Sequence, residues 1–407
     1  MTEWKDCKIE DYFELSYGKS LTAANRIAGE YPVYGSGGIS GTHNESLVKG
    51  PGIIVGRKGT VGSVYWENRD FYPIDTVFYV VPKAGNDIRF LYYLLKTLPL
   101  ENMNTDAAVP GLNRNNAYRL KVLDIPYDDQ IIIADILGSI DQKIELNQRI
   151  NETLEGMARS VFKSWFVDFD PVRAKAEGRE PEGIESATAA LFPSTFSPNG
   201  LPEGWEEKPI SEIGDVITGK TPSTKDEENY GDQTPFITIP DMHGKIYVLA
   251  CGKYLSSKGV SMQKNKTLPA GSICVSCIAT PGLTILTHEE CQTNQQINAV
   301  VPFKKEVQNF RFWQIKEVSE EVISKGSGGS VFHNLNKSQF SDLKVIEPSF
   351  ELIKAYEEIV SSFMEKILEN EKQNQTLAAL RDTLLPKLIS GELRVDTATE
   401  KLKEAIG

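Results

Sequence analysis

Several glycine-rich loops of this sequence carry side chains that suit contacts with nucleic acid. Two of them, Arg57-Lys58-Gly59-Thr60 and Asn113-Arg114-Asn115, lie in the first third of the chain. Two more, Lys220-Thr221-Pro222-Ser223 and Lys325-Gly-Ser-Gly-Gly-Ser330, lie in its second half. Arginine, lysine, asparagine, serine and threonine donate hydrogen bonds to phosphate oxygens and base edges. The alternative for each loop is an ordinary solvated turn. The DNA-binding candidates are Ser36, His43, Arg57, Lys58, Thr60, Asn113, Arg114, Lys220, Thr221, Ser223, Lys225, His243, Lys325, Ser327, Asn336 and Lys337.

A second candidate site is the segment Gly214–Thr221, "GDVITGKT", which fits the phosphate-loop pattern G-x-x-x-x-G-K-[ST]. That pattern needs a helix that begins at the lysine, because the helix N-terminal N–H groups hold the phosphate. Pro222 follows at once, and the next ten residues have no apolar period. We therefore interpret the segment as a tight glycine turn at the end of a strand. A nucleotide-hydrolysing enzyme is the alternative.

The cysteines offer a possible zinc site. Cys274 and Cys277 form a C-x-x-C pair, with Cys251, His288 and Cys291 nearby in sequence. A structural zinc site needs a second pair at knuckle spacing, which is absent, so a buried apolar strand is the favoured interpretation and no metal is predicted. The sequence also shows no methyltransferase, nuclease or helicase motif. We predict no catalytic residue on this chain.

The elements that carry these loops occur twice. "EWKDCKIEDYFELSYGKS" from Glu3 aligns without a gap on "GWEEKPISEIGDVITGKT" from Gly204, an offset of 201. The offset is 220 where "FYVVP" (78–82) matches "NAVVP" (298–302). It is 223 where "QKIELNQRINETL" (142–154) matches "EKILENEKQNQTL" (365–377). A tandem duplication predicts two similar heads, two similar helices and approximate two-fold symmetry.

Each copy ends in a long amphipathic helix whose apolar positions repeat every 3.5 residues, the pattern of a coiled-coil seam. Antiparallel pairing in which the seam asparagines meet places Asn147 opposite Asn374 and Asn151 opposite Asn370. Paired numbers then sum to 521, so Ile133 faces Leu388 and Trp165 faces Tyr356. Buried asparagines penalise slipped registers by about 1–3 kcal/mol, because a mismatched partner leaves them unsatisfied. The alternative is that these asparagines lie on an exposed face. The predicted pairing residues are Ile133, Ile140, Ile144, Asn147, Asn151, Leu154, Val161, Phe363, Ile367, Asn370, Asn374, Leu377, Leu384 and Leu388.

The predicted fold class is α+β. Two similar α/β heads are separated by two long antiparallel helices, with pseudo-two-fold symmetry. The predicted segments are head one (1–124), a first helix (125–167), a linker (168–203), head two (204–346), a second helix (347–391) and a polar tail (392–407).

The composition is that of an ordinary globular protein, with 40% hydrophobic and 25% charged residues. No apolar run approaches the ~20 residues of a membrane span, and the polar, acidic N-terminus does not resemble a signal peptide. Five cysteines fit a reduced compartment, so we expect a cytoplasmic protein. The net charge of −12 argues against a protein that coats nucleic acid. Head one, however, is close to neutral, and the acidic surplus lies on the helices, linker and tail.

Over nearly its whole length the chain resembles the specificity subunit of type I restriction-modification systems. The strongest parts are the helical repeats, the W…G-K-T-P-S segment that begins head two, and "LAALRDTLLPKLISGELRV" near the C-terminus. The resemblance implies two target-recognition domains, each of which reads one half of a bipartite double-stranded DNA target. The helices would set the gap between the halves and dock two modification subunits.

The resemblance also implies a non-catalytic subunit without cofactors of its own. S-adenosylmethionine would bind to the modification subunits, and ATP and Mg²⁺ would serve the restriction (translocase) subunits where a system has them. It transfers no individual base-contacting residue, because the heads differ between members. The alternative from another class is a structural scaffold whose heads bind proteins.

Overall fold

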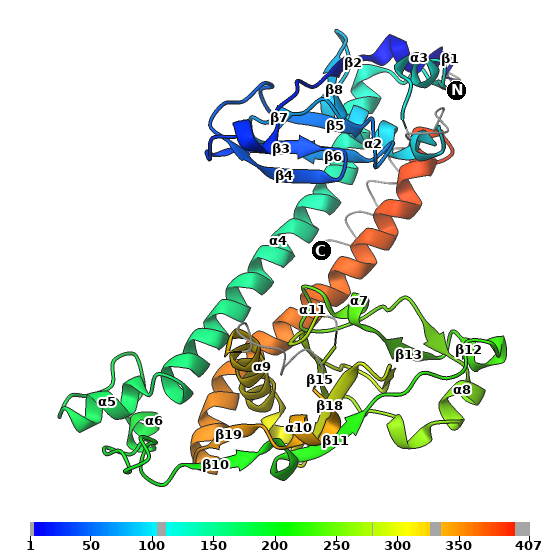
Figure 1. Ribbon diagram of the computed structural model, residues 1–407. Coiled ribbons are helices and arrows are strands. Elements are labelled where there is room, and N and C mark those ends of the chain that lie inside the picture. The colour runs from blue at the N-terminus through cyan, green and yellow to red at the C-terminus, as the bar shows by residue number, and fades with distance from the viewer. Residues whose placement is uncertain (1–3, 104–110, 279, 326–334, 395–407) are drawn as a thin grey trace. The chain divides into compact units, whose positions relative to one another are not determined.

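The computed structural model describes residues 4–103, 111–278, 280–325 and 335–394, with the backbone alone for 321–325. The chain divides into two compact units, residues 1–146 with 374–407 and residues 147–373. Each unit contains one head and one part of each long helix (Figure 1). Mixed strand and helix content in both heads agrees with the predicted α+β class.

Head one is built on a four-stranded antiparallel sheet in the order β2 (Phe13–Tyr17), β8 (Val77–Pro82), β5 (Gly52–Gly56), β6 (Val64–Glu67). Strand β5, "GIIVG", is buried along its whole length, as expected for an apolar strand between two neighbours. Helix α2 (Ile88–Thr97) packs on β5 and β6. The other elements of head one are β1 (Asp6–Lys8), α1 (Ile9–Tyr12), η1 (Ala23–Asn25), β3 (Tyr31–Gly35), β4 (Gly38–His43), β7 (Tyr72–Pro73), η2 (Leu100–Asn102), α3 (Arg114–Tyr118) and β9 (Lys121–Leu123).

Head two repeats this sheet in the order β11 (Gly214–Thr218), β18 (Ile297–Pro302), β15 (Ile273–Ser276), β16 (Thr284–Leu286). Helix α9 (Gln308–Lys325) takes the place of α2, and it packs on β15 and β16. The other elements are β10 (Glu206–Pro209), η3 (Ile210–Glu212), η4 (Glu227–Asn229), β12 (Tyr230–Gly231), β13 (Thr234–Ile237), α7 (Ile239–Met242), β14 (Tyr254–Leu255), α8 (Ser257–Ser261), η5 (Lys264–Lys266), β17 (Gln292–Thr293), η6 (Lys305–Val307), α10 (Lys337–Ser341) and β19 (Lys344–Glu347).

The two heads share their topology down to single hydrogen bonds. Gly18 N donates to Val77 O at 3.2 Å, and Gly219 N donates to Ile297 O at 3.1 Å. A Cβ at either glycine would lie 2.1 Å from a backbone oxygen, so only glycine fits this turn in both heads. Gly18 and Gly219 differ by the offset of 201, and Val77 and Ile297 differ by the offset of 220. Both offsets therefore relate equivalent residues of the two heads.

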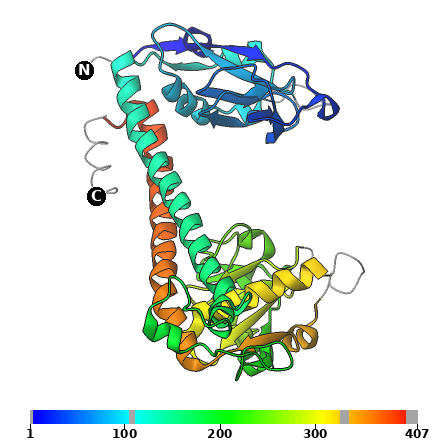
Figure 2. The ribbon, with the colours of Figure 1, turned by 90° about the vertical axis from the view of Figure 1, so that its left-hand side faces the viewer.

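The long helices α4 (Tyr127–Phe166) and α11 (Phe350–Ile389) each have 40 residues. In unit 1 the start of α4 lies beside the end of α11 (Figure 2); there Arg381 Nη1 donates to Asp141 Oδ1 at 2.8 Å. In unit 2 the end of α4 lies beside the start of α11, and Tyr356 Oη donates to Ala158 O at 3.1 Å. Within each unit the helices therefore run antiparallel. All the predicted pairing residues are buried or half-buried.

The asparagine layer is polar and buried. Asn370 Nδ2 donates to Asn151 Oδ1 at 2.8 Å, the contact that the 521 register requires. Asn151 Nδ2 donates to Glu371 Oε1 at 3.0 Å, and Asn147 Nδ2 donates to Gln373 Oε1 at 2.8 Å. Asn147 and Asn374 belong to different units, so their predicted contact stays a prediction.

Pro386 lies inside α11 and does not end it. The helix continues through Pro386 to Ile389, and Ser390 N donates to Pro386 O at 3.0 Å. The chain leaves the helix at Gly391, whose φ of +72° is the left-handed conformation that glycine adopts readily. Pro386 is exposed, and a proline in the last turn costs only one helical hydrogen bond there.

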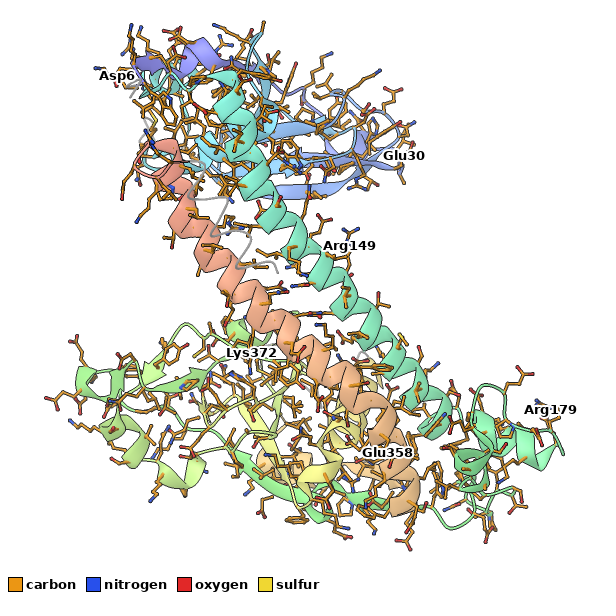
Figure 3. The ribbon with its side chains drawn as sticks, turned by 180° about the vertical axis from the view of Figure 1, so that it is seen from behind. Asp6, Glu30, Arg149, Arg179, Glu358 and Lys372 are labelled. Carbon is orange, nitrogen blue, oxygen red and sulfur yellow. The ribbon has the colours of Figure 1, made fainter. Side chains whose placement is uncertain are left out.

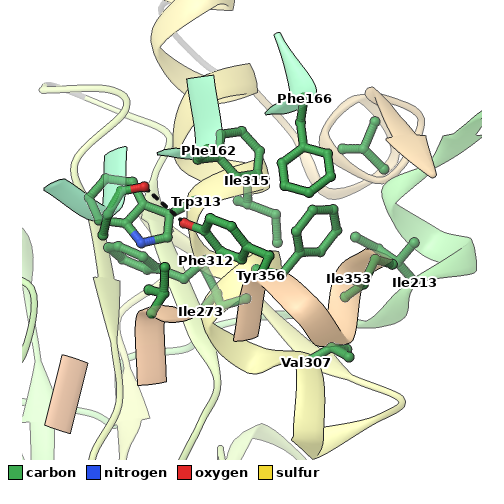
Figure 4. Packing of buried hydrophobic residues seen from close by; sticks show 14 of the residues in the cluster. Phe162, Phe166, Ile213, Ile273, Val307, Phe312, Trp313, Ile315, Ile353 and Tyr356 are labelled. Carbon is green, nitrogen blue, oxygen red and sulfur yellow. Dashed lines mark hydrogen bonds between the residues drawn. The ribbon is translucent and has the colours of Figure 1, made fainter. Parts of the chain in front are cut away.

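The core of unit 2 is a cluster of aromatic rings. Phe166 lies 5.0 Å from Phe310 and 5.5 Å from Tyr356, between ring centroids. Figure 4 shows these elements converging, with rings from α4, α9 and α11 and the Tyr356–Ala158 hydrogen bond dashed. The linker folds against the same cluster: it forms α5 (Asp170–Ala176) and α6 (Ser186–Ala190), and Phe192 lies edge-on to Trp165 at 5.1 Å.

Candidate nucleic-acid interface

A polar hollow of about 260 Å³ opens in head one at the ends of β2 and β5. At its centre, the ring of Tyr17 is 49% exposed. The guanidinium carbon of Arg57 lies 4.9 Å from the centroid of that ring, and that of Arg114 lies 5.1 Å from it. The residues that line this head-one hollow are Tyr17, Arg57, Lys58, Gly111, Leu112, Asn113, Arg114 and Asn115.

Backbone hydrogen bonds fix the loop that carries Arg57. Arg57 N and Lys58 N both donate to Thr76 O, at 2.9 and 3.0 Å, and Leu112 N donates to Arg57 O at 2.8 Å. This brings residues 57–58 and 112–114, which are far apart in sequence, to one place. Tyr17 is the last residue of β2, and its side chain lines the same hollow. Successive side chains of a strand point to opposite faces of the sheet.

Arg114 is placed by the short helix α3, which begins with it. Asn113 is the N-cap of α3; its Oδ1 accepts from Asn115 N at 2.9 Å and from Asn116 N at 3.3 Å. The predicted candidate Asn113 therefore has a capping role, although it also lines the hollow. Arg114 Nη1 donates to Leu15 O at 3.3 Å, which holds the guanidinium over the sheet edge.

The hollow carries uncompensated positive charge. Arg57 Nη1 donates to the backbone oxygen of Asp75 at 2.9 Å, so its partner is a carbonyl and not a carboxylate. Within the described ranges of the chain, neither Arg57 nor Arg114 forms an ion pair. Arg114 Nε is buried and has no hydrogen-bond partner there. Lys58 adds a third, exposed positive charge.

Ser36 and Thr60 lie next to this hollow. Ser63 Oγ donates to Ser36 O at 2.7 Å and to Thr60 O at 3.1 Å, which joins the turn at 36–37 to the loop after β5. Gly62 has a φ of +76°, and a Cβ there would lie 2.4 Å from Glu101 N. The loop can close in this way only with glycine at that position.

The two candidate histidines are placed differently. His43 is only 7% exposed; its Nδ1 accepts from Ile27 N at 3.1 Å, and its ring meets Tyr72 edge-on at 5.5 Å. These contacts give His43 a structural role, and we leave it out of the proposed DNA surface. His243 is exposed at the end of α7.

The other candidates of head two lie on separate segments. Lys220, Thr221, Ser223 and Lys225 follow β11, where Thr221 Oγ1 donates to Gln295 Oε1 and Ser223 O accepts from Asn229 Nδ2. Asn336 caps α10 by accepting from Gln339 N at 3.0 Å, and Lys337 is exposed. Lys325 ends α9, with its side chain undescribed, and Ser327 lies outside the described residues.

The place in head two that corresponds to the head-one hollow has different chemistry. Leu335 N donates to Cys277 O, as Leu112 N donates to Arg57 O, so Cys277 stands where Arg57 does. Thr218 stands where Tyr17 does, and its Oγ1 donates to Asn298 Oδ1 at 2.6 Å. Asn298 Nδ2 donates in turn to Cys277 Sγ at 3.2 Å. These three side chains are neutral and form hydrogen bonds with one another.

Comparison with known proteins identifies the family. A model described as "Type I restriction modification DNA specificity domain" matches residues 1–156 and 202–379. This chain belongs to that family of specificity subunits. The type I restriction enzyme HindI specificity subunit of Haemophilus influenzae is 38% identical over 376 residues, which cover 80% of this chain and 82% of that protein. The MjaIX specificity subunit of Methanocaldococcus jannaschii is 25% identical over 339 residues, 78% of this chain and 72% of that protein.

Solved structures agree on the fold. The S subunit of the type I restriction-modification system from M. genitalium superposes with a TM-score of 0.62, covering 95% of this chain and 96% of that chain. The two sequences are 17% identical, so this likeness concerns the fold alone.

In this specificity subunit the segment Gly214–Thr221 is not a phosphate loop. Its first five residues form β11, and no helix begins at Lys220. Lys220 N donates to Thr293 O at 3.0 Å, the same bond that Lys19 N makes to Pro73 O in head one. The segment is the glycine turn at a strand end that the sequence favoured.

The cysteine pair does not converge. Cys274 packs with Leu268 and Cys291, whereas Cys277 belongs to the aromatic core cluster of unit 2, so their thiols enter different apolar surroundings. Burial raises the pKa of Cys274 to about 12. Across residues 4–394, where described, three or more His, Cys, Asp or Glu side chains nowhere gather as a metal-ligand set. Nor is any helix of that described part long and apolar enough to cross a membrane.

Sequence reasoning did not select Tyr17 as a member of the hollow, whereas Asn115 belongs to the loop Asn113-Arg114-Asn115 that it did select. A signal for Tyr17 was present: an aromatic residue immediately precedes the repeated Gly-Lys turn in head one, where head two has Thr218. Its proximity to Arg57 and Arg114 depends on strand pairing, which the spacing did not reveal.

Proposed function

We propose that this chain is the DNA-recognition subunit of a type I restriction-modification complex, in which each head reads one half of a bipartite target. The observation that carries the proposal is the repeat itself. Two heads with one sheet order are each followed by a helix of 40 residues. Two similar heads, each with its own long helix, suit a DNA target with two separate half-sequences. The bases between the half-sequences would not be recognised.

The helices serve as the spacer in this account. In this proposal, antiparallel pairing along both helices would put one head at each end. The buried asparagine contact between Asn151 and Asn370 supports a single register within unit 2. Heads at such a separation can enter successive major-groove faces of the duplex, about 34 Å apart. The separation of the half-targets is then a property of helix length.

The exposed face of α4 is the proposed docking surface for the modification subunits. Ile132 and Leu146, which both lie in unit 1, are 38% and 46% exposed. Their spacing of 14 residues returns to about the same side of a helix. A partner that covers this side of α4 would bury both apolar side chains.

The chain itself is non-catalytic in this proposal. S-adenosylmethionine binds to the modification subunits, and ATP and Mg²⁺ act on restriction subunits where these are present. A nucleotide-hydrolysing chain would need a helix at Lys220, where the backbone makes the Gly-Lys turn instead. A scaffold that binds only proteins would have no use for the positive charge of the head-one hollow.

The test is to map methylated adenines in a host that carries this chain with its modification subunits. The expected result is one motif with two specified halves and a fixed number of unspecified base pairs between them. Deletion of the chain should abolish methylation at that motif. A continuous motif without an unread gap, or methylation that persists without the chain, would contradict the proposal.

A further inference from the structure

The head-one hollow brings two guanidinium groups to one tyrosine ring. The guanidinium carbons of Arg57 and Arg114 both lie about 5 Å from the Tyr17 centroid, at 4.9 and 5.1 Å. The two like charges repel each other, and the residues that line the hollow include no carboxylate. The tyrosine ring attracts both cations through its π face, which offsets part of that repulsion.

A purely structural role does not account for the whole arrangement. One hydrogen bond from each arginine to a main-chain oxygen, Asp75 O for Arg57 and Leu15 O for Arg114, would fasten the loops. The remaining donors stay available, and Arg114 Nε is buried without a partner. An unsatisfied buried donor on a charged group costs more than a neutral one, so the protein holds Arg114 here at a cost that its hydrogen bond to Leu15 does not offset.

The chemistry of the hollow favours a phosphate over a base edge. Arginine forks bind both guanine and phosphate. A guanine is neutral, however, and would compensate none of the three positive charges of Arg57, Arg114 and Lys58, whereas a phosphodiester brings one negative charge to them. The Tyr17 ring already carries both guanidinium groups close to it, so we assign it to positioning the arginines and not to stacking on a base.

We propose that Tyr17, Arg57 and Arg114 form a receptor for one backbone phosphate of the DNA bound by head one, with no equivalent in head two. The inference rests on the proposed function. Head two has the neutral Thr218–Asn298–Cys277 chain at the corresponding place, where each polar group already has a partner. The two half-targets are therefore held unequally: head one makes a salt-sensitive contact that head two lacks.

The test measures DNA binding by the full-length chain assembled with its modification subunits, as a function of salt. The probe is a duplex that carries the mapped bipartite motif; a duplex with both halves scrambled and duplexes with single base-pair changes in each half are the comparisons. The variants are Arg57→Gln, Arg114→Gln, the double variant, Arg57→Lys and Tyr17→Phe. Thermal unfolding of each variant confirms that it is folded.

The double variant should lose about 0.9 in the slope of log K against log salt concentration, the loss expected for one phosphate contact. Binding should weaken equally for the motif and the scrambled duplex, so that sequence preference is unchanged. Arg57→Lys keeps the charge and should keep most of the slope. Tyr17→Phe keeps the ring and should leave both arginines effective.

The matched control is Arg179→Gln in the linker (Figure 3). Arg179 Nε already donates to the Glu177 carboxylate at 3.0 Å, so its loss should leave the slope unchanged. An unchanged slope in the double variant, or relaxed preference at one base pair with an unchanged slope, would overturn the phosphate receptor. If the wild-type complex does not prefer the motif over the scrambled duplex, the proposed function itself fails, which is a distinguishable result.

Discussion

Head one and head two share their sheet order and their glycine turn, yet they differ in chemistry at the ends of the same strands. Head one presents Arg57 next to an exposed tyrosine, and head two has the buried Cys277 there. The backbone bond to the following segment is the same, from Leu112 N in head one and from Leu335 N in head two. The two heads therefore share their backbone structure at this place and differ in its side chains. This difference is consistent with the proposal that the heads recognise different DNA half-sequences.

The heads also differ in how they join the long helices. In unit 1 the joint is mainly aliphatic, with buried leucines and isoleucines from α2, α4 and α11. It adds a polar contact: Tyr93 Oη donates to Asp141 Oδ2 at 2.6 Å, and Arg381 donates to the other oxygen at 2.8 Å. Burial and the Asp141 carboxylate raise the pKa of Tyr93, so the phenol remains a donor. In unit 2 the joint is the aromatic cluster around Phe166 and Phe310. The comparison predicts that unit 2 holds its helices more firmly.

The largest expected effect comes from truncating the equivalent phenylalanines at the starts of α2 and α9. Phe90 and Phe310 are both fully buried, and each change to alanine should cost about 3–5 kcal/mol of unfolding free energy. Phe310 contacts three aromatic rings, whereas Phe90 has one such contact at 6.0 Å. Phe310→Ala should therefore cost about 1 kcal/mol more. Hydrogen exchange in α9 and α2 reports each loss, and an equal or larger loss for Phe90→Ala would contradict the comparison.

The second prediction concerns the polar layer between the helices. Asn370→Leu leaves the buried Asn151 without its amide partner and should lower the unfolding free energy by about 1–3 kcal/mol. The double variant Asn151→Leu, Asn370→Leu should recover most of that loss, because both members are then apolar. Gln375→Leu, an exposed position on the same helix, is the control and should change stability by less than about 0.5 kcal/mol. Losses that simply add in the double variant would argue against a paired layer.

The third prediction tests the polar contact of unit 1. Asp141→Asn removes the negative charge that contacts both Arg381 and Tyr93, and it should lower the unfolding free energy by about 1 kcal/mol. The loss is small because the side chains of Arg381 and Asp141 are partly exposed, at 22% and 33%. Chemical denaturation measures the loss. A cost as large as that of Phe310→Ala would contradict the small contribution assigned to this polar contact.

The smallest effect is a pH dependence confined to unit 2. Glu357 accepts hydrogen bonds from Phe310 N at 2.7 Å and Asn309 Nδ2 at 3.0 Å, and its burial raises the pKa of the carboxyl group. A raised folded-state pKa favours the protonated form, so this contribution to stability is complete below the unfolded-state pKa and is lost as the pH rises through the folded-state pKa. The stability of the wild type relative to Glu357→Gln should therefore fall as the pH rises from about 4 towards 7. A difference that is constant with pH would rule out this assignment.

Patterns with a long period were readable from the sequence. The 223-residue offset located both 40-residue helices, and the seam placed Asn151 against Asn370, because a helical period repeats many times along one element. Local features were harder to predict. His43 is a DNA-binding candidate by residue type, but its contacts with Ile27 and Tyr72 bury it, and the sequence does not reveal those contacts.

Part of the head-one hollow could be predicted from the sequence. Arg57, Lys58, Asn113 and Arg114 were chosen by residue type, and the structure brings them together. Tyr17 was missed because its role depends on β2 lying next to β8, a pairing of residues about 60 apart in sequence. Residue type suggests charge and hydrogen bonding, but only strand pairing shows which loops share a hollow.

The central claim is that the two helices set the gap between the half-sequences that the two heads recognise. The most direct test is to lengthen both helices together. Four residues, about one turn or ~6 Å, are inserted at corresponding positions of α4 and α11 near the polar layer, and methylated adenines are mapped in the host. The account predicts that both half-sequences stay the same and that the unread gap between them grows. An unchanged gap, or an altered half-sequence, would contradict it.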